Sequence, residues 1–452
     1  MKRIYFGIVF GYEELGAVRM AVNALKKAGI TPFVVLNDTA CDYSDILPEG
    51  LLLYSRLVNR DHRLLLREVR QRLRRFAGIQ PWGVHSLINL QDRMWPCFLD
   101  VQAAFPKASC FDPRIVAATA IKANLRFHLA TTPWAVPYLL VSRSDISLPS
   151  PSFIGALSRL LQTSGDVIVK PVIGLAGQGV VRVRKATLGR RLFGAIQALF
   201  DAQSEIYSAN TSVFIEDWKR RQSLASMVLI ERYVPGVEYS VEGFANHEGA
   251  IEDLVIQMKT KQEQIPVFRD LEYEAEHPSS CADILACVKG LLSKLDYRRL
   301  PFHIELKVDR DGKAYPIEFN PRMGGGSIVD LVENIHGTNL LEKAFRYTVS
   351  SPHPRRTFLT RVLQPKPRQT GKLKKYVGLA ALLRHPSCVF VKKIVPEGAV
   401  VQAKDREVYL LETCLVGSTR KDVRAHASKL FKNLRAVFSP ATEPRSLRGK
   451  KP

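Results

Sequence analysis

The sequence has 452 residues, of which 46% are hydrophobic, so it can bury several cores and we expect two to four domains. It contains 66 Lys and Arg against 43 Asp and Glu, and the net charge of +23 favours anionic ligands. We find neither a signal-peptide cleavage region nor an apolar segment of membrane length, so we expect a cytoplasmic protein without a membrane partner. The seven scattered cysteines lack Cys-x-x-Cys spacing, which argues against a zinc ribbon or a disulfide framework.

Three segments hold much of the positive charge: residues 56–75, 355–375 and 445–451. In the first segment arginines alternate with apolar residues at helical spacing, the second is interrupted by prolines, and the third is a tail. Neither a zinc finger nor an aromatic-interleaved RNA-binding signature accompanies them. We interpret them as a solvated helix face, a linker and a tail, and we do not expect a nucleic-acid partner.

The first hundred residues have the pattern of an α/β domain. A strand is predicted over residues 4–10, a helix over about 17–28 and a second strand over 32–36, which together form a βαβ unit. The glycines of this region do not have G-x-G-x-x-G spacing, so we do not predict a dinucleotide site. We place this N-terminal domain at residues 1–112, with one long helix over about 113–129 after it.

Prolines near residue 351 predict a second boundary, because they exclude regular helix over residues 351–375. Segments of strand and helix alternate before this boundary, in a central region over residues 113–350. Beyond it the sequence predicts short strands over 388–395, 400–403 and 408–416 and a closing helix over 419–438.

A glycine-rich segment follows the apolar strand predicted at residues 167–171. The strand contains Lys170, and Gly174, Gly177 and Gly179 come next. Glycines let backbone N–H groups approach phosphate oxygens closely, and a lysine adds a point charge to the same phosphates. The P-loop order G-x-x-x-x-G-K-[ST] is absent. The pattern predicts a phosphate-binding lid, although a glycine hairpin with a solvent-facing lysine has the same sequence features.

The strand at residues 228–230 leads into a segment with three candidate nucleotide contacts. Backbone groups where a strand meets a loop can pair with the edge of adenine, and a carboxylate a few residues later can accept the ribose hydroxyls. Glu231, Val234 and Glu238 have the spacing for these contacts. An ordinary hairpin around the Pro-Gly turn at 235–236 is the alternative.

A predicted β-hairpin carries the most informative residues. Strands over residues 301–307 and 314–320 flank a turn, so Glu305 and Glu318 can face each other with Asn320 on the same side. Three oxygen ligands on one face suit Mg²⁺, and two facing carboxylates would repel each other without a cation. Arg322 and the glycines after it provide a fork for an acyl phosphate or a substrate carboxylate. A chance hairpin with exposed acids is the alternative.

This hairpin resembles the metal-binding signature of the ATP-grasp superfamily. The order of lysine strand, glycine loop, hinge glutamate and metal hairpin, over about residues 122–345, is similar to that family too. The amino-acid sequence at residues 303–307 and 318–325 is most similar to that of carboxylate-amine ligases of the L-amino acid (dipeptide) ligase type. The long polar segment between the glycine loop and Met227 departs from the family pattern.

The resemblance implies an α/β and α+β architecture, namely the ATP-grasp fold. It has an N-terminal βαβ (pre-ATP-grasp) domain, a central region with a lid at roughly residues 165–235, and a C-terminal mixed subdomain at 351–452 that completes the ligase. By the same resemblance, the residues that would contact ATP are Lys122, Lys170, Gly174, Gly177, Gly179, Glu231, Val234, Glu238 and Lys261. Those that would hold two Mg²⁺ ions, with Mn²⁺ as a substitute, are Glu305, Glu318 and Asn320. Arg322 and Lys170 would be catalytic.

The function that the resemblance implies is an ATP-dependent carboxylate-amine ligase. It would form an amide bond through an acyl phosphate, release ADP and phosphate, and act on amino acids or a related small carboxylic acid, with a homodimer as a compatible state. An ATP-grasp enzyme with another acceptor, in peptide extension, purine or carboxylation chemistry, is an alternative. A non-catalytic, basic nucleic-acid-binding protein is another.

Overall fold

The computed structural model divides into two compact units. The first consists of residues 1–175, 180–257 and 276–354, and the second of residues 176–179, 258–275 and 355–452. The structure describes residues 3–11, 15–36, 45–48, 50–54, 62–90, 94–108, 112–172, 179–208, 227–264, 267–276, 281–325, 328–329, 331–332, 339–346, 357–365, 370–393, 395–402 and 410–440.

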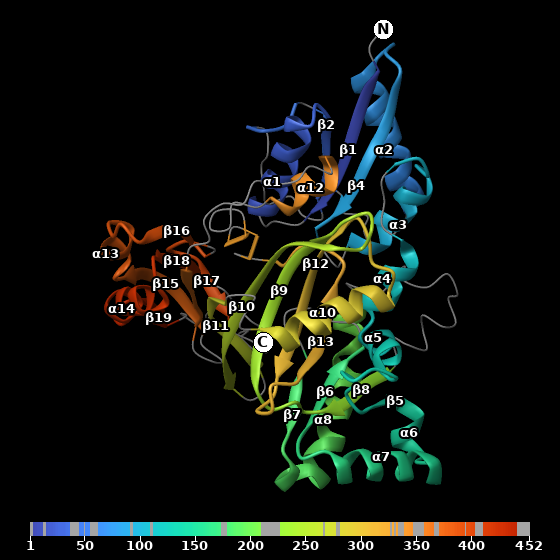
Figure 1. Cartoon of the computed structure of the whole chain (residues 1–452), viewed down its shortest axis with the longest axis vertical. Helices are drawn as coiled ribbons and strands as arrows, with labels where there is room; N and C mark the ends of the chain where they lie inside the picture. Colours follow the sequence, from blue (N-terminus) through green and yellow to red (C-terminus); the bar gives the residue numbers. More distant parts are fainter. Residues whose placement is uncertain are drawn as a thin grey trace, which may run out of the picture. The chain divides into compact units, whose positions relative to one another are not determined.

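The N-terminal part of the first unit is a parallel sheet (Figure 1). Its strands, in the order β3-β2-β1-β4, are β3 (Leu52–Tyr54), β2 (Thr31–Leu36), β1 (Ile4–Gly11) and β4 (Trp82–Asn89). Strand β1 lies between two parallel neighbours, which explains its nearly continuous apolar sequence. The helices of this part are α1 (Leu15–Lys27), α2 (His62–Ala77) and α3 (Trp95–Ala103). The predicted βαβ unit is confirmed.

The single helix predicted over residues 113–129 is wrong, because two helices occupy this segment. Helix α4 (Pro113–Ala120) ends at Ile121, whose backbone is extended, and α5 (Lys122–Leu129) begins immediately after it. The backbone N–H of Lys122 donates to the carbonyl oxygen of Val172 at 3.0 Å. This hydrogen bond joins the first residue of α5 to the residue that follows the strand containing Lys170.

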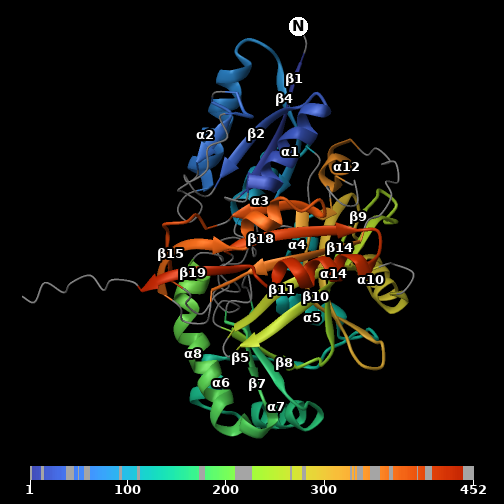
Figure 2. The ribbon, with the colours of Figure 1, turned by 90° about the vertical axis from the view of Figure 1, so that its left-hand side faces the viewer.

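An antiparallel sheet has the order β5-β8-β6-β7, and its strands β8, β6 and β7 lie within the predicted lid at roughly residues 165–235. It contains β5 (Tyr138–Ser142), β8 (Met227–Arg232), β6 (Val167–Pro171) and β7 (Val181–Val183), with helices α6 (Arg143–Ser147), α7 (Pro151–Thr163) and α8 (Leu188–Ser208) and the 3-10 helix η2 (Lys185–Thr187). Ser150 caps α7 by accepting from the Phe153 N–H, and Pro151 occupies the first turn. Apolar side chains of α7 and α8, including Leu157 and Ile196, share one core with the strands of this sheet. Figure 2 shows the ribbons of these two helices.

The predicted metal hairpin is present in the first unit. Strands β13 (Ala314–Asn320), β12 (Leu300–Val308), β9 (Val237–Ala245) and β10 (Ile251–Gln264) are neighbours in this order. Helix α10 (Ala282–Lys294) packs against β12 and β13, and α12 (Leu340–Arg346) packs against β9 and β12. Ile304 and Phe319 are fully buried between these elements. Every second residue of β12 and β13 therefore faces the other way, toward the candidate site.

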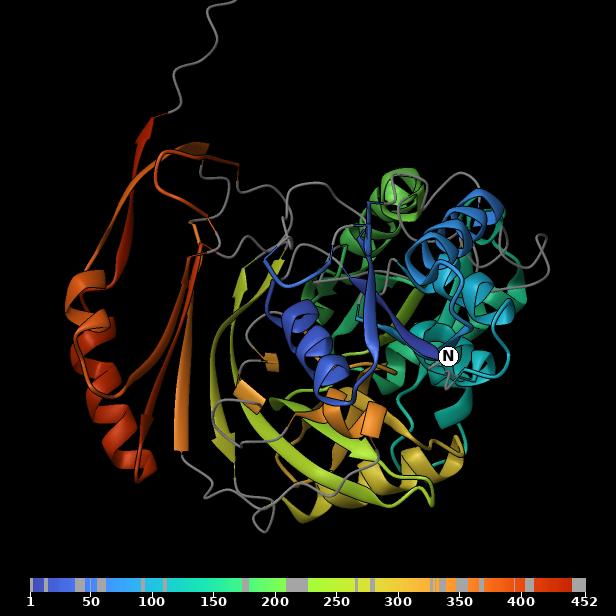
Figure 3. The same ribbon diagram turned by 90° about the horizontal axis from the view of Figure 1, so that it is seen from above.

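The second unit is built from two groups of antiparallel strands. Strands β11 (Val267–Glu276), β14 (Thr357–Leu363), β18 (Leu411–Gly417) and β16 (Cys388–Lys393) are neighbours in this order, and β17 (Val400–Gln402), β15 (Thr370–Val377) and β19 (Arg435–Pro440) form a second sheet. Helices α13 (Leu379–Leu383) and α14 (Arg420–Phe431) complete the unit, and Figure 3 shows α14 along one side of its strands. Leu373, Leu415 and Phe431 share one core.

Two expectations for this unit are wrong. The basic segment 355–375, interpreted as a linker, contains all of β14 and the start of β15, because its prolines lie outside both strands. The closing helix, predicted to reach residue 438, ends at Phe431, because residues 435–440 pair with β15 as strand β19. Pairing between distant segments overrides the local helical pattern here.

None of the described helices is both long and apolar enough to cross a membrane. Four cysteines whose side chains the structure describes are free thiols, and three of them, Cys281, Cys287 and Cys414, are buried.

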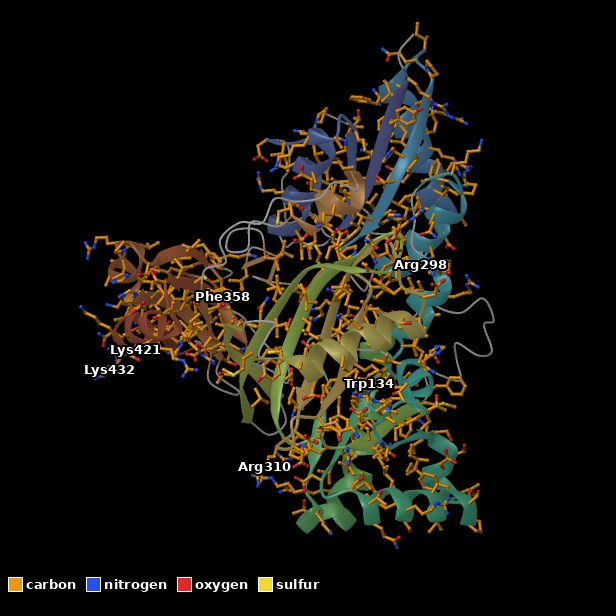
Figure 4. The ribbon with its side chains drawn as sticks, viewed as in Figure 1. Trp134, Arg298, Arg310, Phe358, Lys421 and Lys432 are labelled. Atoms are coloured by element: carbon orange, nitrogen blue, oxygen red, sulfur yellow. The ribbon has the colours of Figure 1, made fainter. Side chains whose placement is uncertain are left out.

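Gly290 of α10 lies directly under the ring of Trp134, which is labelled in Figure 4. A Cβ at this position would be 2.0 Å from the ring carbon Cη2 of Trp134. Overpacking of this kind costs about 1–3 kcal/mol. We expect Gly290→Ala to lower the free energy of unfolding by that amount in chemical denaturation.

Gly194 in the exposed part of α8 provides the matched control, because a Cβ there meets no atom within 4 Å. Gly194→Ala should stabilise the protein by up to about 1 kcal/mol through helix propensity alone. Equal effects of the two substitutions would show that the Trp134 contact does not constrain residue 290.

Candidate functional site

The structure brings the three predicted metal ligands together. Glu305 pairs directly with Glu318 across β12 and β13, and a bulge follows Glu305. The amide Nδ2 of Asn320 is 3.2 Å from Oε1 of Glu318. The Glu305 and Glu318 side chains are 20% and 24% exposed, so both can reach a ligand.

Two cationic side chains lie beside these carboxylates. Lys122 Nζ is 3.4 Å from Oε2 of Glu318, and His303 Nε2 is 3.7 Å from Oε1 of Glu305. Among the residues that the structure describes, no three His, Cys, Asp or Glu side chains cluster as a metal site. Two carboxylates and one amide form an open oxygen set, which fits Mg²⁺ because this ion keeps positions for phosphates and water.

Lys170 is not the solvent-facing lysine of an ordinary glycine hairpin. Its side chain is only 3% exposed, and its Nζ lies 2.5 Å from Oε1 of Glu231 on the neighbouring strand β8. Oε2 of the same carboxylate accepts from Nε of Arg126 at 2.7 Å. Glu231 is therefore a buried anion held between two buried cations.

Burial and charge shift the pKa values of this cluster. Burial, together with the positive charges of Arg126 and Lys122, lowers the pKa of Lys170 to about 8 in spite of Glu231. Burial alone would raise the pKa of Glu231, but Arg126 and Lys170 lower it to about 2. At neutral pH the carboxylate is therefore ionised, and the lysine remains mostly charged.

Arg126 is a site residue that the sequence reading missed. It is 1% exposed, and its Nη1 and Nη2 donate to the carbonyl oxygens of Pro316 and Ile317 at 2.6 and 3.4 Å. It thus connects Glu231 to the strand that carries Glu318. The available signal was its position four residues after Lys122, on the same face of a helix.

The predicted nucleotide hinge lies after β8. Val234 is buried with Val136 and Tyr315, and its carbonyl oxygen accepts from Lys307 Nζ at 3.2 Å. Glu238, 7% exposed, pairs with Lys307 across β9 and β12.

Tyr233, which precedes Val234, is a second residue that the sequence reading missed. Its ring lies 3.7 Å from Cζ of Arg182 and 4.5 Å from Nζ of Lys307. Two cations on one aromatic ring hold the start of the hinge in place.

A second buried carboxylate, Glu242 of β9, was also missed. It accepts from Ser240 Oγ at 2.9 Å, from the backbone N–H of Gly324 at 2.9 Å, and pairs with Nδ1 of His303. Although burial opposes it, Glu242 and Glu305 raise the pKa of His303 to about 10. The signal was the alternation of Ser240 and Glu242 on one face of β9, opposite His303 and Glu305.

Glu242 also fixes the turn that carries Arg322. A Cβ on Gly324 would lie 2.9 Å from Oε1 of Glu242 and 3.0 Å from Nδ1 of His303, so only glycine fits here. Arg322 is 9% exposed, and its Nη1 donates to the carbonyl oxygen of Met323 at 2.7 Å. The Arg322 side chain is thereby held just after the end of strand β13.

The remaining predicted contacts are only partly described. Gly174 and Gly177 lie outside the described residues, and Gly179 has a positive φ of 73°. Lys261 belongs to strand β10, but its side chain lies outside the described residues. Their assignment to ATP phosphates stays a prediction.

Comparison with known proteins identifies the fold. Residues 163–330 match the ATP-grasp domain family. No curated protein sequence matches the chain. The crystal structure of an L-amino acid ligase from Bacillus licheniformis is similar, with a TM-score of 0.75 and 18% identity over 97% of this chain and 99% of that one.

Two further solved structures share the fold. The phosphoribosylglycinamide synthetase from Anaerococcus prevotii has a TM-score of 0.60 and 11% identity over 97% of this chain and 100% of that one. The biotin carboxylase domain of Hydrogenobacter thermophilus 2-oxoglutarate carboxylase, crystallised with MgADP and bicarbonate, has a TM-score of 0.62 and 12% identity over 96% and 90%. The predicted ATP-grasp fold is confirmed.

Replacing Glu231 by Gln leaves Lys170 and Arg126 buried without their carboxylate, and removing one partner of a buried ion pair costs about 3–5 kcal/mol. We expect the free energy of unfolding at pH 7 to fall by that amount in chemical denaturation. Because folding lowers the pKa of Glu231 from 4.5 to about 2, its contribution is present above pH 4.5 and is lost as the pH falls toward 2. The difference between the two proteins should shrink over this range.

Glu248, whose side chain is 74% exposed in the turn after β9, supplies the control. Glu248→Gln should leave the free energy of unfolding nearly unchanged. If Glu231→Gln changed the free energy of unfolding as little as the control, or if its effect did not depend on pH, the Glu231 carboxylate would not stabilise the fold by pairing with Lys170 and Arg126.

Proposed function

Because residues 163–330 match the ATP-grasp domain family, we propose that this chain is an ATP-dependent ligase that activates a carboxylate as an acyl phosphate and joins it to an amine. The observation that supports this most is the pairing of Glu305 with Glu318 beside Asn320, with Lys122 3.4 Å from Glu318. Acidic oxygens next to a buried lysine are what a metal-bound triphosphate requires. ADP and phosphate are the expected by-products.

In this proposal Lys122 and Lys170 contact the phosphates of ATP. Both are buried, at 7% and 2% exposure, and a buried ammonium group is stabilised by anionic neighbours. Glu231 and Val234 lie at the adenine edge, and Glu238 accepts from the ribose. Gly174, Gly177, Gly179 and Lys261 complete the phosphate contacts from the lid and from β10.

Glu305, Glu318 and Asn320 would hold Mg²⁺, or Mn²⁺ in its place. A divalent ion there neutralises charge on the phosphate oxygens. Around it, Lys122 and His303 fix the two carboxylates from either side, and Arg126 holds the backbone of β13 at residues 316 and 317.

The proposed reaction has two steps. An oxygen of the substrate carboxylate attacks the γ-phosphorus in line, the bond from this phosphorus to ADP breaks, and Lys170 and Arg322 neutralise the charge of the transferring oxygens. The amine then attacks the carbonyl carbon of the acyl phosphate, phosphate leaves, and the nitrogen gives up a proton. Holding both reactants in a closed site provides proximity and keeps water from the mixed anhydride.

We propose amino acids or a related small carboxylic acid as substrates, in the cytoplasm. The support is the L-amino acid ligase with a TM-score of 0.75, against 0.60 and 0.62 for the other two structures. The names of those two enzymes indicate substrates other than pairs of amino acids. An ATP-grasp enzyme with another acceptor is therefore the second candidate.

A phosphate-release screen over pairs of amino acids tests this assignment, with mass determination of the condensed product. We expect phosphate release that depends on two amino acids, and a product lighter by one water than their sum. Release that requires bicarbonate or a phosphoribosylamine instead would favour the second candidate.

Glu318→Gln should abolish ADP formation, because it removes one of the two facing carboxylates, and it should leave the thermal unfolding midpoint nearly unchanged. Asp311→Asn, in the exposed turn of the same hairpin, is the matched control and should keep full turnover. ADP formation at the wild-type rate in Glu318→Gln would refute the metal assignment.

Arg322→Lys should lower kcat by about 10²–10³-fold, the loss typical of removing one transition-state donor, because a point charge cannot replace a bidentate fork. Arg310→Lys, in the turn between β12 and β13, makes the same exchange at an exposed position (Figure 4). Steady-state kinetics of both variants would show whether the effect belongs to residue 322. A similar kcat in the two variants would speak against the assigned role.

A further inference from the structure

The positive charge of this chain is concentrated at its C-terminal end. Residues 355–452 contain 23 Lys and Arg but only 6 Asp and Glu, so this quarter of the sequence carries +17 of the total +23. The other 354 residues share the remaining +6. The proposed ligase chemistry uses none of these basic residues, so their concentration needs a separate explanation.

Helix α14 presents a row of these charges to solvent. Its apolar residues Val423, Ala427 and Phe431 are buried in the core of the second unit. The opposite face is exposed and carries Lys421, Arg424 and Lys429, with Ala425, Ser428 and the acidic Asp422 among them, and Lys432 follows directly after the helix. At 1.5 Å per residue the row is about 16 Å long. Figure 4 shows Lys421 and Lys432 on the outer side of this helix.

Two arginines at the start of α14 are held in fixed positions. Arg420 contacts Glu274 through Nε and Nη2 at 2.7 and 2.8 Å, and Arg424 does so at 2.9 and 2.6 Å. Glu274 is only 4% exposed, whereas the two arginine side chains are 41% and 54% exposed. Burial raises the pKa of Glu274, but the two guanidinium groups outweigh it and lower the pKa.

This arrangement prepares the surface for an anion. Two positive charges face the Glu274 carboxylate, and Asp422 of the first turn adds a second carboxylate, so the positive excess of this face comes from Lys421, Lys429 and Lys432. Since Glu274 already orders both arginines, binding would cost less side-chain entropy than it would for free side chains.

We propose that α14 binds the phosphate backbone of a double-stranded nucleic acid without reading its sequence. A row about 16 Å long exceeds one small anion and matches the dense, regular charge of a duplex. The helix contains no Asn or Gln, and its exposed face has no aromatic residue, so it lacks the usual side chains for adenine recognition and base stacking. The Lys and Arg side chains of this face can therefore contact the phosphates but not read the bases.

The composition of the row disfavours the other anionic partners. Protein interfaces depend on aromatic and apolar anchors and are depleted in lysine, whereas the exposed face of α14 offers only Ala425 and Ser428 between its charges. A helix that inserts into a lipid surface needs large apolar residues on its exposed side. The exposed face of α14 has neither the aromatic and apolar anchors of a protein interface nor the large apolar residues of a membrane-inserting helix.

This proposal differs from the expectation of no nucleic-acid partner. That expectation concerned the basic segments 56–75, 355–375 and 445–451, and α14 belongs to none of them. Only the structure shows that Lys421, Arg424, Lys429 and Lys432 share one exposed face and that Glu274 orders the arginine among them.

The test is the salt dependence of binding by the full chain to a 20-base-pair DNA duplex of mixed sequence and to a duplex RNA. For DNA, the slope of log K against log salt is about −0.9 per phosphate contacted. We expect the triple variant Lys421→Gln, Lys429→Gln, Lys432→Gln to bind more weakly and to flatten this slope by about 3. Scrambling the duplex sequence should change nothing.

The chain provides a matched control in α2, where Arg67, Arg74 and Arg75 are also exposed on one helix. Their triple replacement by Gln removes the same charge and should leave the slope unchanged. Far-ultraviolet circular dichroism establishes that both variants are folded, and the double variant Lys421→Gln, Lys432→Gln replaces the triple one if it is not.

Three results would overturn the proposal. One is no binding of either duplex at 50 mM salt. Another is an equal loss in the α2 and α14 variants, which would indicate net charge alone. The third is α14-dependent binding of phosphatidylserine vesicles or of a poly-glutamate peptide without binding of a duplex.

Discussion

The buried carboxylate of Glu231 holds the candidate site together. Its two oxygens lie 2.5 Å from Lys170 and 2.7 Å from Arg126, and Arg126 reaches on to the backbone of the strand that carries Glu318. One anion thus links strand β6, helix α5 and the β12–β13 hairpin. Breaking one side of such a buried pair leaves a charge without compensation, so the three elements are fixed as one set.

Glu242 does the same for the other half of the site. It joins Ser240 on its own strand, His303 on the neighbouring strand and Gly324 in the turn that holds Arg322. His303 then faces Glu305 at 3.7 Å. Each candidate metal carboxylate therefore has a cation beside it, Lys122 for Glu318 and His303 for Glu305, and these positive charges reduce the repulsion between the two carboxylates.

Site residues and charge are separated along the sequence. Apart from Gly177, Gly179 and Lys261, the predicted site residues belong to the first unit, whereas most of the net charge belongs to residues 355–452. Small-molecule ligation needs a few buried charges in exact positions. The exposed row on α14 has the opposite character, since its charges are solvated, numerous and spread along one helix face.

The sequence by itself determined the fold family, the β12–β13 hairpin and the pairing of Glu305 with Glu318, because alternation along adjacent strands places residues by local rules. Only the tertiary structure decided that one predicted helix breaks at Ile121, that strand β19 replaces the end of another, and that Arg126 and Glu242 support the site. Those features depend on partners far away in the chain, 190 residues for Arg126 and Pro316 and 61 for Glu242 and His303. The spacing of Lys122 and Arg126 and the alternation of Ser240 and Glu242 indicate which side chains share a face, but only packing reveals which distant residues they contact.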